Sequence, residues 1–172
     1  MTEALMIPWF LEFSGLTLQI FAAKIAVKIF WVNYEHYFKR RIFVMAHKVI
    51  ETDKAPAAVG PYSQGIAAGP FLFVSGQLGL DPKTGEFAGP DLASQAHQAM
   101  DNLKQIVLAA GFDLNQVVAV DVFLTDMGGF VEFNGIYEKY FSEHRPARAA
   151  IEVSALPKGG LVEVKCICGD FP

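Results

Sequence analysis

PARAAIEVSALPKGGLVEV, residues 146–164, contains two strand-like runs that are joined by a turn at residues 157–160. Runs of β-branched and other apolar residues bounded by Pro and Gly are typical of strands. Arg148 lies at the entry to the first run, and Glu163 lies fifteen positions later in the second. If the two runs pair, Arg148 can hold an anionic substrate group while Glu163 transfers protons beside it. The stretch therefore predicts both a sheet and a small-molecule enzyme site.

The rest of the domain supplies further strands and two helices. The strand-like runs share apolar residues bounded by turn-forming ones, and we expect strands within residues 47–51, 71–80, 116–126, 147–156 and 161–169. Apolar residues at helical spacing predict one helix within residues 92–111, with Asp91 as its N-cap and Gly111 as its stop. The same spacing predicts a second helix within residues 128–144.

This order of elements predicts an α+β fold, in which two helices pack on one face of a mixed β-sheet. The 172 residues suit one core, and an apolar content of 52% excludes general disorder. Because the helices cover only one face of the sheet, something else must bury the other face. A homo-oligomer is a natural solution.

Charge divides the chain near its start. Residues 1–45 carry five Lys or Arg against three acids, a net +2, whereas the remaining residues carry nine against fifteen, a net −6. An acidic body is a poor partner for phosphate backbones, which argues against nucleic-acid binding. Cys166 and Cys168 lie two residues apart in one strand, where a disulfide is geometrically poor and further zinc ligands are missing. We expect two reduced thiols and a cytoplasmic location.

The first 44 residues form an apolar N-terminal extension whose status the sequence leaves open. Charged residues interrupt its apolar run, namely Glu12, Lys24 and Lys28, and charges near a bilayer centre are costly. Met45 begins a stretch that reads as a natural start for a globular domain at residues 45–172. The extension is either a membrane-anchored segment, an amphipathic helix packed on a partner, or an over-extended reading frame. Membrane contact is expected only through it.

Each candidate site residue also has a plainer structural interpretation. Arg148 is otherwise a strand-end arginine or half of an ion pair, and Glu163 is otherwise a solvent-facing or edge side chain. Tyr62 follows the turn-forming pair Gly60-Pro61, so its ring either orients a substrate or covers the core. Asn134 lies among aromatic positions of the second helix, where its amide either binds substrate or caps a backbone group.

Nucleophile and cofactor motifs do not support another reading. Ser75 lacks the Gly-x-Ser-x-Gly sequence of a hydrolase nucleophile, and the four histidines show neither metal spacing nor a triad partner. The sequence contains no phosphate loop and no dinucleotide fingerprint.

Five stretches of the sequence match a known family in order and spacing. They are APAAVGPYSQG, FVSGQLGLDPKTGE, QAMDNLKQIVLAAG, VFLTDMGGFVEFNGIYEKYF and PARAAIEVSALPKGGLVEV, which lie within about residues 46–170. The specific signature is Pro-Ala-Arg followed by Leu156, five further residues and Val162-Glu163. Together these stretches closely resemble the RidA/YjgF family of reactive-intermediate deaminases, and the N-terminal extension lies outside the resemblance.

The resemblance implies a chorismate-mutase-like fold and a homotrimer with three sites in the clefts between subunits. It implies hydrolysis of 2-imino and 2-enamine acids, of the 2-iminobutanoate and 2-iminopropanoate type, to 2-oxo acids and ammonia, without a metal or organic cofactor. By the same resemblance, Arg148 clamps the substrate carboxylate, Glu163 positions or activates the attacking water, and Tyr62 lines the pocket. The other substrate-binding positions that it implies are Ser75, Gly76, Asn134 and Ala150.

The chain departs from the family pattern near Arg148. Ala150 stands where many bacterial members have a cysteine, so any regulation by thiol modification at that position is lost. The stretch before Pro146 is shorter than in familiar members, and Val164 replaces the more usual Ile or Met, which affects the expected pocket width. Two other functions stay open: a regulatory trimer that binds carboxylates without turnover, and a ribonuclease or translation inhibitor.

Overall fold

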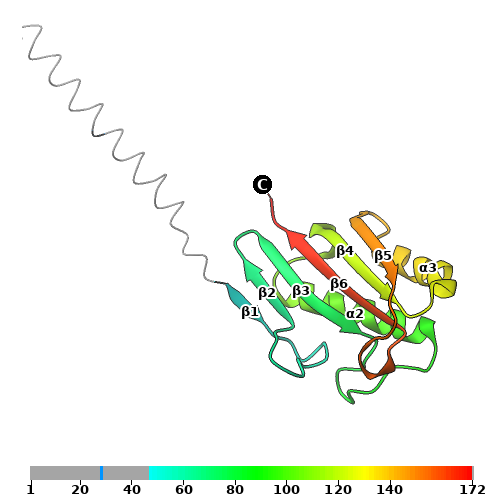
Figure 1. The fold of residues 1–172 in the computed structure, drawn as a ribbon. Coiled ribbons are helices and arrows are strands. Elements are labelled where there is room, and N and C mark those ends of the chain that lie inside the picture. The colour runs from blue at the N-terminus through cyan, green and yellow to red at the C-terminus, as the bar shows by residue number, and fades with distance from the viewer. Residues whose placement is uncertain (1–27, 29–46, 172) are drawn as a thin grey trace, which may run out of the picture. The chain divides into compact units, whose positions relative to one another are not determined.

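A computed structural model of the chain describes Lys28 and residues 47–171. Within residues 47–171 the chain forms one six-stranded sheet (Figure 1). Its strands are β1 (Lys48–Ile50), β2 (Gly65–Ala68), β3 (Phe71–Leu78), β4 (Val117–Leu124), β5 (Ala147–Glu152) and β6 (Val162–Gly169). Apart from Lys28, the predicted N-terminal extension lies outside the described residues, so its boundary with the domain stays a prediction. In the described part of the chain, no helix has the length and apolarity needed to cross a membrane.

Two helices cover one face of the sheet, as the sequence predicts. They are α2 (Leu92–Ala109) and α3 (Phe130–Tyr140), and α2 runs behind the sheet in Figure 1. The side chain of Asp91 caps α2, because its Oδ1 accepts a hydrogen bond of 2.8 Å from the Ser94 amide. Gly111 follows α2 with a φ of 86°, a left-handed conformation that favours glycine and ends the helix. Both predicted helix signals are confirmed.

The core lies between the helices and the sheet. Ala96, Ala99, Leu103 and Ile106 of α2 are fully buried and recur at the three- and four-residue spacing of one helix face. They pack against β3 and β6, and both strands contact α2 through their inward side chains. Inward positions on β6 include Cys166 and Cys168, which are both buried and unpaired. Both of the thiols that we expect to be reduced therefore lie in the core.

The strand order is β1-β2-β3-β6-β4-β5, and every neighbouring pair is antiparallel except β4 and β5, which are parallel. The predicted mixed sheet is confirmed, but the expectation that the strands of Arg148 and Glu163 pair directly is wrong. β5 and β6 follow each other in the sequence, yet β4 lies between them and pairs with both. The parallel β4–β5 pair places α3 in the crossover between the two strands, as parallel pairing requires.

Two details of the chain differ from the sequence-based expectation. The strand β2 falls inside a Pro- and Gly-rich stretch, where only Ile66 of its four residues, Gly-Ile-Ala-Ala, favours a strand. It forms because it pairs with β1 on one side and with β3 on the other. In the second helical stretch, a 3₁₀ turn, η2 (Met127–Gly129), precedes α3. A further 3₁₀ turn, η3 (Pro157–Gly159), lies between β5 and β6.

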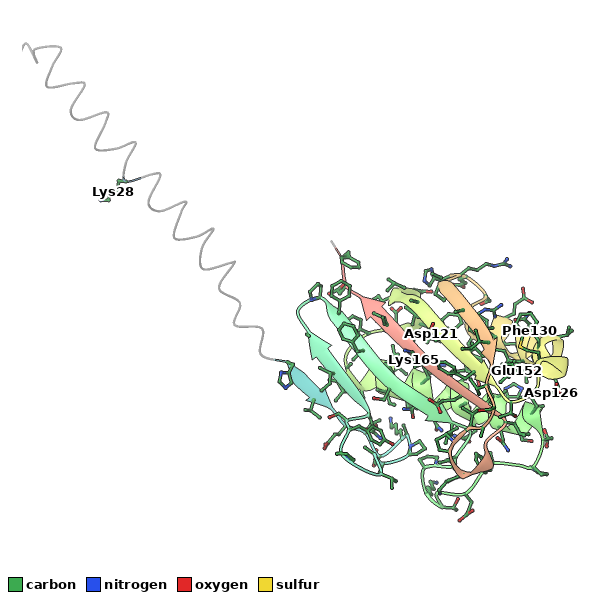
Figure 2. All side chains as sticks on the ribbon, in the orientation of Figure 1. Lys28, Asp121, Asp126, Phe130, Glu152 and Lys165 are labelled. Atoms are coloured by element: carbon green, nitrogen blue, oxygen red, sulfur yellow. The ribbon has the colours of Figure 1, made fainter. Side chains whose placement is uncertain are left out.

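The sheet face opposite the helices carries large apolar side chains and one ion pair, and we call it the open face. Phe73 of β3 is 46% exposed and Ile151 of β5 is 49% exposed. Lys165 of β6 lies 3.2 Å from the carboxylate of Asp121 on the adjacent β4 (Figure 2). These exposed apolar side chains leave the open face available for contact with another molecule.

Candidate active site

Glu163 lies on the open face of β6. Its strand alternates inward and outward residues, because Val162 and Val164 are fully buried whereas Glu163 is only partly so. The Glu163 carboxyl lies against the backbone of Gly76 on β3, so closely that a Cβ atom at position 76 would overlap Oε1 and lie 2.7 Å from Cδ. Glycine at this position therefore lets the carboxyl pack against the strand.

A β-bulge in β3 brings Gly76 to this place. Val74 pairs with Cys166 and Gln77 pairs with Val164, so Ser75 and Gly76 together stand opposite the single residue Lys165. A bulge adds one residue on one strand, and it reorients the side chains there. The hydroxyl of Ser75 donates a 2.6 Å hydrogen bond to the Ser63 carbonyl. Ser75 thus holds the bulge to the preceding loop.

The loop before β2 forms the wall of a cavity above Glu163, which we call the Glu163 cavity. The cavity has a volume of about 720 Å³, and its lining includes Tyr62, Gln64, Ser75, Gly76, Lys158 and Glu163. Tyr62 is 51% exposed, so its ring lines the cavity and does not cover the core. The buried amide of Gln64 shapes the wall, since its Nε2 lies within 3.2 Å of the carbonyls of Thr52, Ala55 and Pro56.

Partial burial changes the acidity of Glu163. Loss of solvent raises the pKa of its carboxyl above the ordinary value, and the positive charge of Lys165 opposes part of that rise. Lys165 stands two residues further along the same face of β6, where Asp121 holds its ammonium. A carboxyl with a raised pKa is suited to accept and return a proton near neutral pH.

Arg148 lies elsewhere, in a group of side chains that we call the Arg148 cluster. Its Nη1 donates a 2.8 Å hydrogen bond to Oδ1 of Asn134 on α3. Its Cζ lies 4.6 Å from the ring centroid of Tyr137 and 5.6 Å from that of Phe130, both on α3. Figure 2 labels Phe130 at the start of this helix. A pocket of about 430 Å³ opens beside Asn134, Tyr137 and Arg148.

The ion-pair interpretation of Arg148 is not met. Side-chain ion pairs within residues 47–171 join Arg145 to Glu138 and Lys165 to Asp121, and neither includes Arg148. An amide and two rings hold the guanidinium, and none of them carries a negative charge. Its charge is therefore available to a ligand.

Arg148 and Glu163 point to opposite faces of the sheet within one protomer. Arg148 pairs with Val120 across β4 and β5, and Val120 is buried beneath the helices, so Arg148 is directed to the helix side. Glu163 pairs with Phe123 across β4 and β6 on the open face. Cross-strand partners share a face. The cleft predicted from direct strand pairing is therefore not formed within a single protomer.

Ala150 and Val164 take no part in either cavity lining. Ala150 lies on the same side of β5 as Arg148, where it packs against the core. Val164 is fully buried on the helix side of β6. The expected effect of Val164 on pocket width is therefore indirect, through the core.

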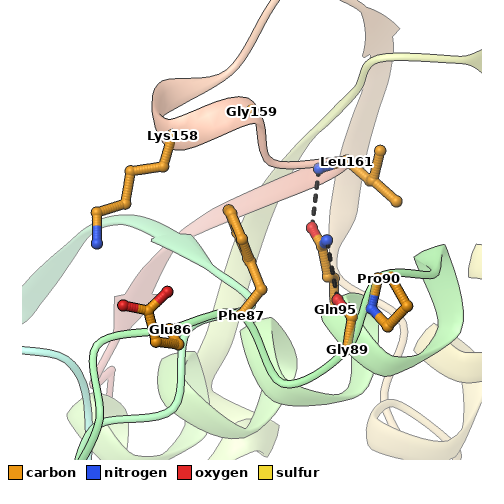
Figure 3. Close-up of a pocket in the computed structure, with 8 residues that line it drawn as sticks. All are labelled: Glu86, Phe87, Gly89, Pro90, Gln95, Lys158, Gly159 and Leu161. Carbon is orange, nitrogen blue, oxygen red and sulfur yellow. Dashed lines mark hydrogen bonds between the residues drawn. The ribbon is translucent and has the colours of Figure 1, made fainter.

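A third pocket adjoins Lys158 (Figure 3). Its volume is about 440 Å³, and Gln95 at its base is hydrogen-bonded on both sides, accepting from the Leu161 amide at 2.9 Å and donating to the Gly89 carbonyl at 3.2 Å. Lys158, with a φ of 58°, donates from Nζ to the Gly85 carbonyl at 2.9 Å. These bonds tie together the two loops that also form a wall of the Glu163 cavity.

The sequence analysis did not single out Gln64, Lys165, Tyr137, Phe130 or Lys158. Tyr137 and Phe130 share the face of α3 that carries Asn134, and their spacing of three and four residues was a usable signal. The alternation of β6 also placed Lys165 beside Glu163. The contacts of Gln64 and Lys158 depend on loops, and no periodic pattern indicates them. Among the described residues, no group of three His, Cys, Asp or Glu side chains is placed to bind a metal.

Comparison with known proteins gives consistent matches over the domain. The family model described as Endoribonuclease L-PSP matches residues 52–169. A RutC family protein of Pyrococcus horikoshii is 50% identical over 120 residues, which cover 70% of this chain and 95% of that protein. The 2-iminobutanoate/2-iminopropanoate deaminase of Mus musculus is 47% identical over 125 residues, covering 73% and 93%. The crystal structure of E. coli TdcF with bound serine has a TM-score of 0.69 and 38% identity, covering 72% of this chain and 99% of that one.

Proposed function

Because the chain belongs to the RidA/YjgF family, we propose that it hydrolyses small 2-imino and 2-enamine acids to 2-oxo acids and ammonia. The observation that carries this proposal is the position of the Glu163 side chain, whose carboxyl lies against Gly76 in a cavity that Tyr62 also lines. A positioned carboxyl of raised pKa is the group that water addition to an imine requires.

The complete site lies between protomers in this proposal. Arg148 faces the helix side of its sheet and Glu163 faces the open side, so a site that uses both takes one residue from each of two copies. The exposed apolar side chains of the open face support its burial against other copies. A closed ring of three copies uses one Arg148 cluster and one Glu163 cavity at every boundary. The proposed assembly is therefore a homotrimer with three equivalent sites.

Substrate binding in this arrangement begins with the carboxylate. The free edge of the Arg148 guanidinium donates two parallel hydrogen bonds to the two carboxylate oxygens. Asn134 accepts a hydrogen bond from Nη1 and lines the same pocket. Tyr62, Ser75 and Gly76 border the space next to Glu163.

The chemistry then needs only water and proton transfer. The Glu163 carboxylate takes a proton from water as the water oxygen bonds to C2 of the iminium, whose C=N electrons move to nitrogen. The same proton passes from Glu163 to the amine nitrogen of the tetrahedral adduct. The hydroxyl of the adduct then gives its proton to Glu163 as its oxygen forms the C=O bond, the C–N bond breaks, and ammonia leaves. Glu163 finally passes this proton to ammonia or to solvent, which restores the carboxylate. An enamine enters the same route after protonation at C3. An imine carbon is already electrophilic, so orientation and proton transfer suffice.

A coupled assay tests the proposal. An amino-acid oxidase generates 2-iminobutanoate from 2-aminobutanoate, and the release of 2-oxobutanoate is followed with and without the protein. Addition of the protein should accelerate release, and Arg148→Ala or Glu163→Ala should lower kcat/KM by about 10²-fold or more. Lys139→Ala is the control, because Lys139 is an exposed cation of α3 that lines neither the Glu163 cavity nor the pocket beside Arg148.

The assay also separates the alternatives. Wild-type protein that binds 2-oxobutanoate but leaves the rate of imine hydrolysis unchanged would contradict catalysis and support a carboxylate-binding regulator. Full activity in Glu163→Ala would contradict the assignment of the proton-transfer group.

A further inference from the structure

The guanidinium of Arg148 is held by uncharged groups alone, and the two aromatic rings are the less expected part of this arrangement. Tyr137 presents its ring to Cζ of Arg148 at a centroid distance of 4.6 Å, closer than the 5.6 Å of Phe130. Both distances are within the range of a cation–π contact, which is about 6 Å or less. The Asn134 amide oxygen fixes only one nitrogen, Nη1. The plane of the guanidinium therefore depends on the rings.

The hydroxyl of Tyr137 does not explain why a tyrosine stands here. The side chain is only 8% exposed, and its buried oxygen lacks a hydrogen-bond partner within the described residues. Burial raises the pKa of Tyr137 to about 12, so the phenol is neutral and supplies no charge to Arg148. What Arg148 meets is the electron-rich face of the ring.

Core packing alone does not explain the contact either. Tyr137 already packs against Phe141 and Phe133, with centroid distances of 4.7 and 5.9 Å. Arg148 is an exposed strand residue that had solvent available to it, and long cationic side chains lose conformational freedom when they are fixed. A fixed guanidinium with its charge unpaired is a suitable receptor for an anion.

We propose that Tyr137 is a positioning residue whose ring face orients the Arg148 guanidinium toward a carboxylate ligand without neutralising its charge. The inference rests on the role of Arg148 as carboxylate clamp in the proposed function. The inference adds a reason for an aromatic partner of Arg148 in place of an acidic one. A protein carboxylate beside the guanidinium would compete with the carboxylate of the ligand. Selectivity for carboxylates then depends on the ring of Tyr137 as well as on the charge of Arg148.

Ring substitutions test the inference in the full-length protein. Tyr137→Phe removes the unpartnered hydroxyl and keeps the ring face, so the Kd of 2-oxobutanoate should change by less than about 2-fold. Pentafluorophenylalanine in place of Tyr137 keeps the shape of the ring but reverses the polarity of its face. It should weaken 2-oxobutanoate binding by about 2- to 30-fold, the loss of one cation–π contact. KM for 2-iminobutanoate should rise by the same factor with little change in kcat.

The matched control is pentafluorophenylalanine in place of Phe133. That ring is fully buried next to Tyr137 and makes no contact with Arg148. The control should leave the Kd unchanged, and thermal unfolding of both fluorinated proteins shows whether each domain is folded. A neutral ligand, 2-oxobutanamide, should bind all variants with similar affinity, because it lacks the charge that Arg148 holds.

The outcomes separate this inference from the proposed function. If Arg148→Ala abolishes 2-oxobutanoate binding but fluorination at 137 leaves it intact, the role of Tyr137 is overturned and the clamp stands. If fluorination at 133 weakens binding as much as at 137, general loosening of α3 explains the effect and the inference is again overturned. If Arg148→Ala binds 2-oxobutanoate like the wild type, the clamp itself fails.

Discussion

Gly76→Ala should inactivate the enzyme while leaving its fold intact. An added Cβ would overlap Oε1 of Glu163 and lie 2.7 Å from Cδ, whereas carbon atoms in contact are about 3.5 Å or more apart. The carboxyl must therefore move by about 1 Å, and a displacement of that size at a reacting group costs about 10²-fold in rate. The φ of Gly76 is not positive, so alanine fits the backbone, and the unfolding free energy should change by less than about 1 kcal/mol.

The assay for this prediction is kcat on enzymatically generated 2-iminobutanoate. KM should change little, because Arg148 holds the substrate carboxylate in this account and its contacts are with Asn134, Tyr137 and Phe130, not with Gly76. Gly135→Ala is the control, since a Cβ at 135 has open space around it. The double mutant Gly76→Ala/Glu163→Ala should be no slower than Glu163→Ala alone, because the first change acts only through the second residue. A Gly76→Ala protein with the kcat of the wild type would refute the claim that catalysis requires the Glu163 carboxyl to lie against Gly76.

Three further predictions concern acidity and stability. The acid limb of the kcat/KM profile should lie above the ordinary pKa of a glutamate, because the pKa of Glu163 is raised. Lys165→Met should move this limb to higher pH, because the lysine charge lowers the pKa of Glu163. Lys104→Met is the control, and a limb that moves to lower pH in Lys165→Met would contradict the assignment of Glu163. The pKa of Glu163 is higher in the folded protein than in the unfolded chain. The stabilisation from protonated Glu163 is therefore complete below the unfolded-state pKa and is lost as the pH rises through the folded-state pKa. The gain in Tm from Glu163→Gln should accordingly grow with pH. Asn102→Ala should lower the unfolding free energy by about 2 to 4 kcal/mol, because the fully buried Asn102 amide donates hydrogen bonds to the carbonyls of Leu78 and Leu80. Denaturant unfolding at fixed protein concentration measures this loss, with the exposed Asn115→Ala as the control. A loss no larger than that of the control would show that these hydrogen bonds contribute little.

Local patterns in the sequence predict the elements well but not their neighbours. Apolar spacing and the Asp91 cap locate α2, and the alternation around Glu163 correctly separates its inward and outward neighbours. The insertion of β4 between β5 and β6 depends on the crossover through α3, and no local signal reports it. For the same reason Arg148 and Glu163 look like partners in one hairpin, although they lie on opposite faces of the sheet.

The site shows the same division between local and long-range information. The turn before Tyr62 and the helix position of Asn134 can be read from the sequence, because each depends on a few adjacent residues. The contact between Gly76 and Glu163 arises from a bulge in β3 paired with β6, which joins segments almost ninety residues apart. The orientation of Arg148 likewise depends on α3, and its rings become visible only once that helix is packed.

Subunit complementation tests the central claim, that each site takes Arg148 from one protomer and Glu163 from another. Arg148→Ala and Glu163→Ala proteins, each inactive alone, are mixed in equal amounts, unfolded and refolded together. In random trimers about one quarter of the sites receive both intact residues, so about a quarter of the wild-type kcat per site should return. If Arg148 and Glu163 act within one protomer, the mixture stays as inactive as its components, and that result would contradict the account.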